Sequence, residues 1–308
     1  SSLLGLVQGF DFPARSSIFP ALIDKKQMMS AVSLNSILWQ GSRMILPAIG
    51  GFLISITDTS LIFFICGIGF FCMMTVLLKL EVRQDNHAND APWYEFKEGV
   101  KFVLQHRLFL TLILLSWISM FFGTSYVQIM PLFAEMLQSG ERGFGLLISA
   151  TGVGSIIGNL FISRYQQSRK LGIMMLSSAA MAPCSLIGFS LVSWILAGTA
   201  GAFWMACCFA ILTSALSSVF LVSSMTVLQI KVPDAFRGRV MGIHSITFSM
   251  ISLGGLAAGA LAAQFSAPVA VVIGAFVVLS SVTWVVFKVS EIAKLDLNLQ
   301  SKQTESFQ

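Results

Sequence analysis

Apolar runs long enough to cross a lipid bilayer recur along the whole chain, and this feature limits its fold more than any other. A transmembrane helix needs about 20 mostly apolar residues. Only 11% of the 308 residues are charged, whereas a water-soluble domain carries about 25%. We therefore predict an all-α, polytopic membrane helix bundle. Nine spans can be read, at about 1–22, 28–56, 60–79, 108–138, 143–163, 171–192, 194–229, 239–265 and 267–289.

Polar sequence divides this bundle into parts. The one long polar segment, 81–107, begins like a loop (RQDNHANDAP) and continues as an amphipathic stretch at 93–106. That pattern predicts a short surface helix. The sequence becomes polar again after residue 290. We expect four parts: the remainder of an N-terminal half at 1–79, a cytoplasmic connector at 80–107, a six-helix C-terminal half at 108–289, and a polar cytoplasmic tail at 290–308.

The distribution of Lys and Arg predicts the orientation, because cytoplasmic loops carry an excess of both. If the turn at 22–28 is cytoplasmic, all 19 of these residues except Arg15, Arg43 and Arg142 fall on the cytoplasmic side. We therefore expect Ser1 outside and the C-terminus in the cytoplasm. The net charge of +5 is then spread over short loops, so it does not indicate a nucleic-acid partner.

Three ionisable residues, Asp11, Arg15 and Arg43, fall at bilayer depth in the first two spans. A charge there costs roughly 2.5–3.5 kcal/mol, so such residues are usually paired and functional. Asp11 and Arg15 are four residues apart and share a helix face. We interpret the three as a cluster facing a central cavity, with Asp11 as a candidate proton-binding residue that the arginines keep ionised. The alternatives are a structural ion cluster and recognition of an anionic substrate by the two arginines.

The turns after the first and seventh spans are similar to each other. LIDKKQMMSAVSLNSI and KVPDAFRGRVMGIHSI both place an Asp (Asp24 or Asp234) before two basic residues and a helix start rich in small residues. If these turns correspond, spans one to three match spans seven to nine, and spans four to six have no partner. Three further spans before Ser1 would complete a twelve-span transporter plan of two weakly similar halves. We therefore expect the native chain to begin upstream of Ser1.

Several stretches carry a family resemblance. PARSSIFPALIDKKQMMSAVSLNSILWQGSRMILPAIGGFLI resembles the fourth and fifth helices of a major facilitator superfamily transporter, of the subfamily that contains the enterobactin exporter and related multidrug efflux proteins. VPDAFRGRVMGI resembles that subfamily's turn between helices ten and eleven, and WYEFKEGVKFVLQHRLFLTLILL its entry into helix seven. The chain would then correspond to helices four to twelve, which are nine of the twelve expected.

Two family motifs are altered in this chain. LPAIGG resembles the antiporter motif G-P-x-x-G-G of helix five, with Leu46 in place of the first Gly. Its Pro47, Gly50 and Gly51 are expected to kink the helix and to allow close packing. The pattern G-x-x-x-D-R-x-x-x-R-R between helices eight and nine appears as GNLFISRYQQSRK, with Ser163 where Asp is common.

The resemblance implies that helices one, four, seven and ten line a central cavity, and three of these are the first, fourth and seventh spans of this chain. The fourth span offers Ser119, Phe122 and Tyr126 at helical spacing, and such groups suit a bulky amphiphilic substrate. Ordinary helix packing is the alternative, because 26 Phe residues make such faces common. Gln8 on the first span and Trp204 on the seventh are further candidates for the cavity wall.

A candidate gate lies in the cytoplasmic turn after the seventh span, at Asp234, Arg237 and Arg239. Cationic side chains at a helix end can hold a gate closed by pairing with Asp234 or with the adjoining bundle. The alternative is that these arginines only reflect the positive charge of cytoplasmic loops.

No Walker loop, Gly-x-Ser-x-Gly motif or metal-ligand spacing occurs, so we expect no enzyme activity, no cofactor and no bound metal. We predict a secondary transporter of the bacterial plasma (inner) membrane, an antiporter that exports a drug-like molecule or a siderophore by proton-coupled alternating access. Its expected partners are membrane lipid, a small-molecule substrate and a proton. The alternatives are a non-transporting truncated protein or accessory subunit, and a lipid transporter of the same fold.

Overall fold

The computed structural model describes residues 57, 59–79, 92–165, 171–199 and 201–288, with the single positions 38 and 42. Within these ranges the chain forms helices joined by turns, and no strand. The first two predicted spans, 1–22 and 28–56, lie outside the described residues. The other seven predicted spans are each matched by a described helical segment that is long and apolar enough to cross a membrane: Ser60–Leu78, Arg107–Met136, Gly140–Tyr165, Leu171–Ile195, Ala202–Lys231, Phe236–Gln264 and Ala267–Lys288.

The largest difference between predicted and observed bounds lies at the turn before the seventh span. The sequence predicts a span from 194, whereas α8 (Leu171–Ile195) runs past that point and α9 starts only at Ala202. Gly198 has a φ of +86°, which lies in the left-handed region that favours glycine. The amide of Thr199 donates a hydrogen bond to the carbonyl of Leu196 at 3.0 Å. A sequence of small apolar residues therefore forms a turn where hydropathy alone suggested helix.

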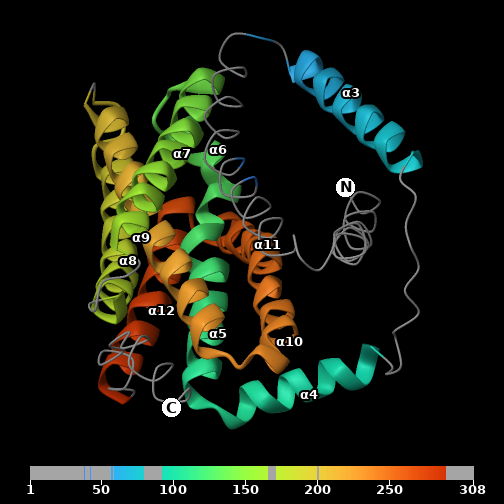
Figure 1. Ribbon diagram of the computed structural model, residues 1–308. Helices are drawn as coiled ribbons and strands as arrows, with labels where there is room; N and C mark the ends of the chain where they lie inside the picture. Colours follow the sequence, from blue (N-terminus) through green and yellow to red (C-terminus); the bar gives the residue numbers. More distant parts are fainter. Residues whose placement is uncertain are drawn as a thin grey trace. The chain divides into compact units, whose positions relative to one another are not determined.

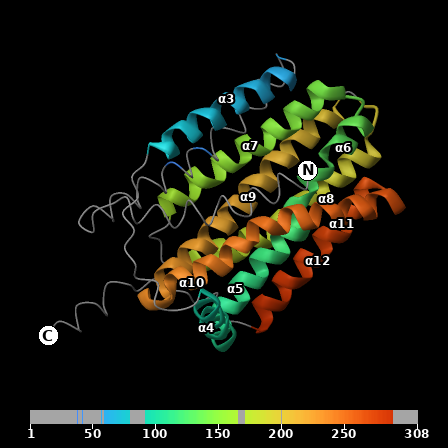
Figure 2. The ribbon, with the colours of Figure 1, turned by 90° about the vertical axis from the view of Figure 1, so that its right-hand side faces the viewer.

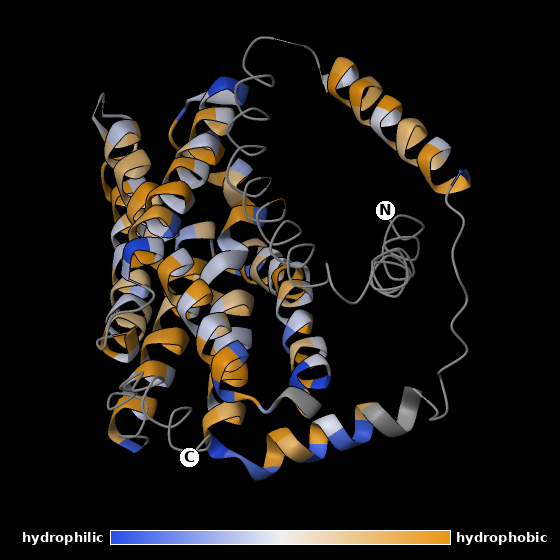
Figure 3. Ribbon diagram, viewed as in Figure 1, coloured by the Kyte–Doolittle hydropathy of each residue, from blue (hydrophilic) through white to orange (hydrophobic). Residues whose placement is uncertain are grey.

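The chain divides into two compact units, and α3 (Thr59–Leu78) is the helix described in the first. Its sequence is apolar around the whole circumference, and Figure 3 shows hydrophobic residues along its full length. Phe63, Phe64, Phe70 and Phe71 are all more than 60% exposed within the chain. A helix with no polar face is typical of a membrane span.

In the described part of the second unit there are six spans and a leading helix (Figures 1 and 2). Few residues separate consecutive spans, which therefore run antiparallel to each other. The elements in chain order are α4 (Pro92–Gln105), α5 (Arg107–Ile118), the π-helix η1 (Ser119–Thr124), the 3-10 helix η2 (Ser125–Ile129), α6 (Met130–Met136), α7 (Gly140–Tyr165), α8 (Leu171–Ile195), α9 (Ala202–Lys231), α10 (Asp234–Ser245), the 3-10 helix η3 (Ile246–Phe248), α11 (Ser249–Gln264) and α12 (Ala267–Lys288).

Glycines on α7 allow α7 and α9 to approach closely. A Cβ added at Gly154 would lie 2.9 Å from the backbone carbonyl carbon of Ile211, and one added at Gly158 would lie 3.0 Å from that of Ala215. Backbone atoms cannot move aside as a flexible side chain can, so both positions need glycine. Small residues of this kind are how membrane helices gain close packing without a hydrophobic driving force between them.

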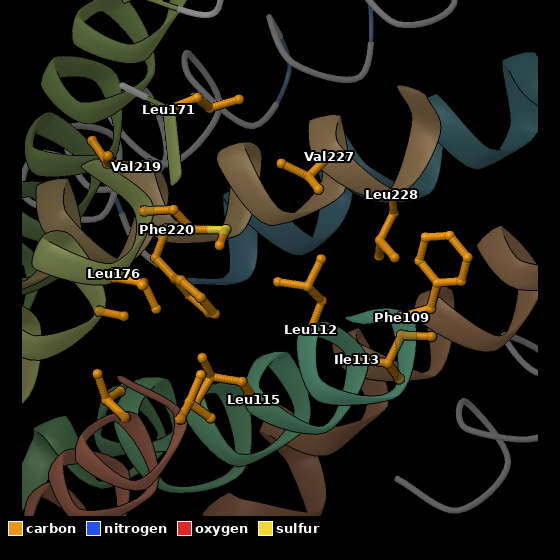
Figure 4. Close-up of a cluster of buried hydrophobic side chains, with 14 of the residues drawn as sticks. Phe109, Leu112, Ile113, Leu115, Leu171, Leu176, Val219, Phe220, Val227 and Leu228 are labelled. Atoms are coloured by element: carbon orange, nitrogen blue, oxygen red, sulfur yellow. The ribbon is translucent and has the colours of Figure 1, made fainter. Parts of the chain in front are cut away.

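Buried apolar side chains fill the second unit in two clusters. Figure 4 shows part of the first cluster, in which Phe109 of α5 lies beside Leu228 of α9, and Phe220 of α9 lies beside Leu176 of α8. The other cluster surrounds Tyr126, Phe133 and Phe189. The spans are thus tied to each other at two levels of the bundle.

Helix α4 packs against α10 and α5, and it belongs to the same compact unit as the six spans. Figure 1 shows it crossing the end of the bundle at which α5 starts and α9 passes to α10. The ring centroids of Phe102 on α4 and Phe236 on α10 are 4.3 Å apart, with an angle of 8° between the planes. Gly99 fits closely here, because an added Cβ would lie 2.8 Å from Cβ of Arg239. The predicted amphipathic helix is therefore confirmed at α4, and residues 80–91 of the predicted connector lie outside the described residues.

Candidate functional site

The span that begins at Arg107 is not a continuous α-helix. After α5 it passes through the π-helix η1 and the 3-10 helix η2 before α6. Gly123, inside η1, weakens a regular α-helix at this point. Pro131 has no amide hydrogen with which to continue α-helical bonding, and the carbonyl of Val127 instead accepts a bond from the amide of Met130, three residues on. A π-turn inside an α-helix, like η1 here, is frequently found at a functional site.

This break changes how the predicted cavity residues are arranged. The sequence placed Ser119, Phe122 and Tyr126 on one helical face, but a π-turn holds more residues than an α-turn and so shifts the register. Ser119 lines one small cavity, whereas Phe122 and Tyr126 line a second. Each cavity has a volume of about 20 Å³, which is close to the space that one water molecule needs.

The first cavity is apolar with a few hydroxyl groups. The Oγ atom of Ser119 is buried, and among the described residues it has no hydrogen-bond partner. Thr213 donates a hydrogen bond to Oγ of Ser185 at 2.9 Å, and Ser185 donates to the carbonyl of Phe209 at 3.2 Å. The wall can therefore offer hydroxyls to a polar group in apolar surroundings. Its lining is Ser119, Met120, Gly123, Thr124, Ala179, Ala182, Pro183, Leu186, Thr213, Ser217, Phe220 and Val278.

The second cavity lies between η1, η2, α11 and α12 and has an aromatic wall. Tyr126 is 3% exposed, and its ring centroid is 5.7 Å from that of Phe189. Small residues of α11 and α12 form the opposite wall, so the aromatic rings have space beside them. The lining is Phe121, Phe122, Ser125, Tyr126, Gly254, Ala257, Ala258, Leu261, Ala270, Val271 and Gly274.

Trp204 lies apart from both cavities. It is in the first turn of α9 and is 65% exposed, with Phe203 as a neighbouring ring at 5.5 Å between centroids. The sequence placed it deeper because it predicted that the span starts at 194. Because α9 starts later, Trp204 is at the helix end, where Trp is typical of the membrane–water interface.

The candidate gate residues lie at the junction of α9, α10 and α4. Arg239 donates a hydrogen bond from Nη1 to Oε2 of Glu98 at 2.6 Å, and Nε of Arg237 donates to the carbonyl of Gln229 at 3.1 Å. Asp234 is the first residue of α10. The pairing of Arg239 with Glu98 was not predicted, although the place of Glu98 in the amphipathic stretch of an otherwise apolar chain was a signal for it.

The remaining predicted site residues lie outside the described part of the chain. They are Gln8, Asp11, Arg15 and Arg43 of the proposed substrate and proton pathway, and Pro47, Gly50 and Gly51 of the altered antiporter motif. The charged cluster therefore stays a prediction. In the described ranges, no group of three or more His, Cys, Asp or Glu side chains is arranged to hold a metal ion.

Comparisons with known proteins match a family model over nearly the whole chain and individual relatives over most of it. A family model described as "Transmembrane secretion effector" matches residues 2–306. The chain is similar to the staphyloferrin A transporter of Staphylococcus aureus, with 24% identity over 258 residues that cover 83% of this chain and 63% of the relative. It is also similar to the enterobactin exporter EntS of Escherichia coli O1:K1, with 28% identity over 269 residues, 83% of this chain and 62% of the relative. No solved structure matches it.

A third relative is the enterobactin exporter EntS of Shigella boydii, with 28% identity over 269 residues. The match again covers 83% of this chain and 62% of the relative. The chain thus spans less than two thirds of the length of the curated relatives that it matches.

Proposed function

We propose that this chain, which belongs to the transmembrane secretion effector family of the major facilitator superfamily, exports a small molecule of the siderophore type. The observation that carries the proposal is the family match from residue 2 to residue 306. The names of the relatives, a staphyloferrin A transporter and enterobactin exporters, point to the substrate class. Proteins of this kind are transporters rather than enzymes.

The broken span supports this function. Discontinuous helices that line cavities are typical of substrate sites in secondary transporters. Here η1 and η2 interrupt the span, and Ser119, Phe122 and Tyr126 lie within the interrupted part and line the two cavities. Siderophores combine polar chelating groups with apolar or aromatic parts, so hydroxyls beside aromatic rings match their chemistry. Both cavities are too small for such a molecule, and binding therefore requires an open conformation.

The proposed mechanism is alternating access, in which two halves of the transporter rock around a midplane site. Asp11 would carry the coupled proton, and Arg15 and Arg43 would face it or an anionic substrate. The protein would work in the bacterial inner membrane, with its C-terminus in the cytoplasm and lipid around the apolar helices. Arg237 and Arg239 would act at the cytoplasmic gate.

Flux into inside-out vesicles tests the proposal. Vesicles that contain the protein should accumulate iron-free enterobactin or staphyloferrin A above the level of empty vesicles, and accumulation should rise when a pH gradient is imposed. The variant Asp11→Asn should lose the response to the gradient, while Asp24→Asn, in the predicted cytoplasmic turn, should retain it. Absence of flux for siderophores and amphiphilic dyes alike would overturn the function, and flux that ignores the gradient would remove the proton coupling. Movement of labelled phospholipid alone would assign a lipid substrate instead.

A further inference from the structure

Two glycines from different helices contact consecutive backbone carbonyls of the π-helix η1. Gly254 of α11 faces the carbonyl of Phe121: an added Cβ would lie 2.7 Å from its carbon atom and 2.8 Å from Cα of the same residue. Gly274 of α12 faces the carbonyl of Phe122, whose oxygen would lie 2.9 Å from an added Cβ. Distances below 3.0 Å are essentially never seen for a real Cβ, and the facing atoms are backbone atoms that cannot rotate away.

The contacts continue along the same span into η2. A Cβ added at Gly255, next to Gly254, would lie 2.8 Å from Cβ of Gln128. By contrast, Gly259, farther along α11, has nothing within 4 Å of an added Cβ. The close approach of α11 is therefore local to the broken part of the span.

The position of η1 determines which side chains reach which cavity. Ser119, at its start, lines the first cavity, and Phe122 and Tyr126 line the second, which Gly254 and Gly274 themselves help to form. A π-turn is less favourable than an α-turn and persists only where its surroundings hold it. Close contact of α11 and α12 with its carbonyls supplies such a restraint on both sides.

We infer that Gly254 and Gly274 are positioning residues that hold η1 in its π form and thereby fix the orientation of Phe122 and Tyr126 toward the substrate. The inference rests on the proposed function in so far as it concerns substrate. A methyl group at either position forces α11 or α12 away from η1. The aromatic wall then shifts relative to the bound molecule, while the chemistry of every side chain that contacts substrate stays the same.

The test compares Gly254→Ala and Gly274→Ala with Gly259→Ala, which makes the same change on α11 in open space. Siderophore flux is measured against concentration in vesicles, and amide hydrogen exchange is measured for peptides that cover residues 119–129. We expect Gly254→Ala and Gly274→Ala each to raise KM at least fivefold, with the maximal rate within twofold of the unaltered protein. Both should also speed amide hydrogen exchange at 119–129. Gly259→Ala should match the unaltered protein in KM and exchange.

Two results would overturn the inference. One is that amide hydrogen exchange at 119–129 is unchanged in both Gly254→Ala and Gly274→Ala. The other is that this exchange is altered while KM stays within twofold of that of the unaltered protein. If Gly254→Ala fails to fold, Gly274→Ala tests the inference alone. Its added Cβ would come closer than 3.0 Å only to the carbonyl oxygen of Phe122, so this variant is the milder change. Exchange is read without any substrate, so the restraint on η1 is tested even if siderophore flux is absent and the proposed function fails.

Discussion

At the scale of single residues, the described spans satisfy buried hydroxyls mainly within their own helices, and a few hydroxyls link two helices. Ser116 donates to the carbonyl of Leu112 at 2.8 Å, and its Oγ lies 3.2 Å from Oγ of Ser224 on α9. Hydrogen bonds between membrane helices contribute about 0.6 kcal/mol on average and at most about 1.7. Hydrogen bonds of this kind therefore make only a small contribution to the free energy of unfolding.

The bond between Thr213 and Ser185 gives a prediction at this scale. Thr213 is 1% exposed and donates to Ser185 at 2.9 Å, so Thr213→Val removes the donor while it keeps the volume. We expect a loss of about 0.6–1.7 kcal/mol in the free energy of unfolding, measured by thermal or denaturant unfolding in detergent. Thr213→Ser restores the hydroxyl and should recover most of the loss. A Val variant as stable as the unaltered protein would contradict the prediction.

The ion pair between Glu98 and Arg239 gives a second prediction. The two side chains are 38% and 26% exposed, so water screens much of their attraction and the pair contributes about 0–1 kcal/mol. Glu98→Gln should therefore lower the unfolding free energy by less than about 1 kcal/mol, and high salt should shrink the difference. Lys101→Gln, an exposed position on the same helix, serves as the control. A double-mutant cycle with Arg239→Gln isolates the pair, and a coupling well above 1 kcal/mol would refute this estimate.

At the scale of helices, the contact between α7 and α9 gives a third prediction. Gly158→Val places a branched side chain against the backbone of Ala215, where even a Cβ has no room. Overpacking of this kind costs typically about 1–3 kcal/mol, which should appear as a lower unfolding midpoint and a smaller folded yield. Gly67→Val on α3, where an added Cβ meets nothing within 4 Å, should change neither. Equal behaviour of the two variants would show that α7 does not need its glycines.

Hydropathy predicted the described helices well because burial in lipid needs only length and apolar composition. The span starting at 60 and that starting at 267 were placed to within a residue or two. The start of α9 was missed because Gly198 and its small neighbours are apolar and yet form a turn. The π-turn was missed for a different reason: neither Gly123 nor Pro131 alone breaks the helical pattern, and the turn depends on α11 and α12 beside it.

The candidate site was harder to predict than the fold, since it depends on register. Ser119, Phe122 and Tyr126 were predicted to share one helical face, but a register change inside the span separates them into two cavities. The pairing of Arg239 with Glu98 joins residues far apart in sequence. No local pattern determines such a pair, although the amphipathic stretch indicated where a partner would be found.

At the scale of the whole molecule, the distribution of positive charge gives a fourth prediction. Cytoplasmic loops carry the excess of Lys and Arg, and the connector, the turn before α10 and the tail would all lie on that side. A green fluorescent protein fused after Gln308 should therefore fluoresce in cells, and alkaline phosphatase fused at the same place should be inactive. A fusion in the turn between α6 and α7, just before Arg142 in the first turn of α7, should give the opposite pattern. Active phosphatase at the C-terminus would reverse the orientation.

The register change at η1 also bears on how this span tolerates changes in length. A π-turn accommodates roughly one residue more than an α-turn, and one residue of an α-helix corresponds to about 100° of rotation. Within 119–124 the π-turn absorbs that extra residue, so deleting one residue there would let α5 continue as regular helix while η2 and α6 keep nearly the same orientation relative to α5. The same deletion in a regular α-helical part of the span would turn everything after it by about 100°, so η1 is the point at which this span can lose one residue and still present the same faces to its neighbours.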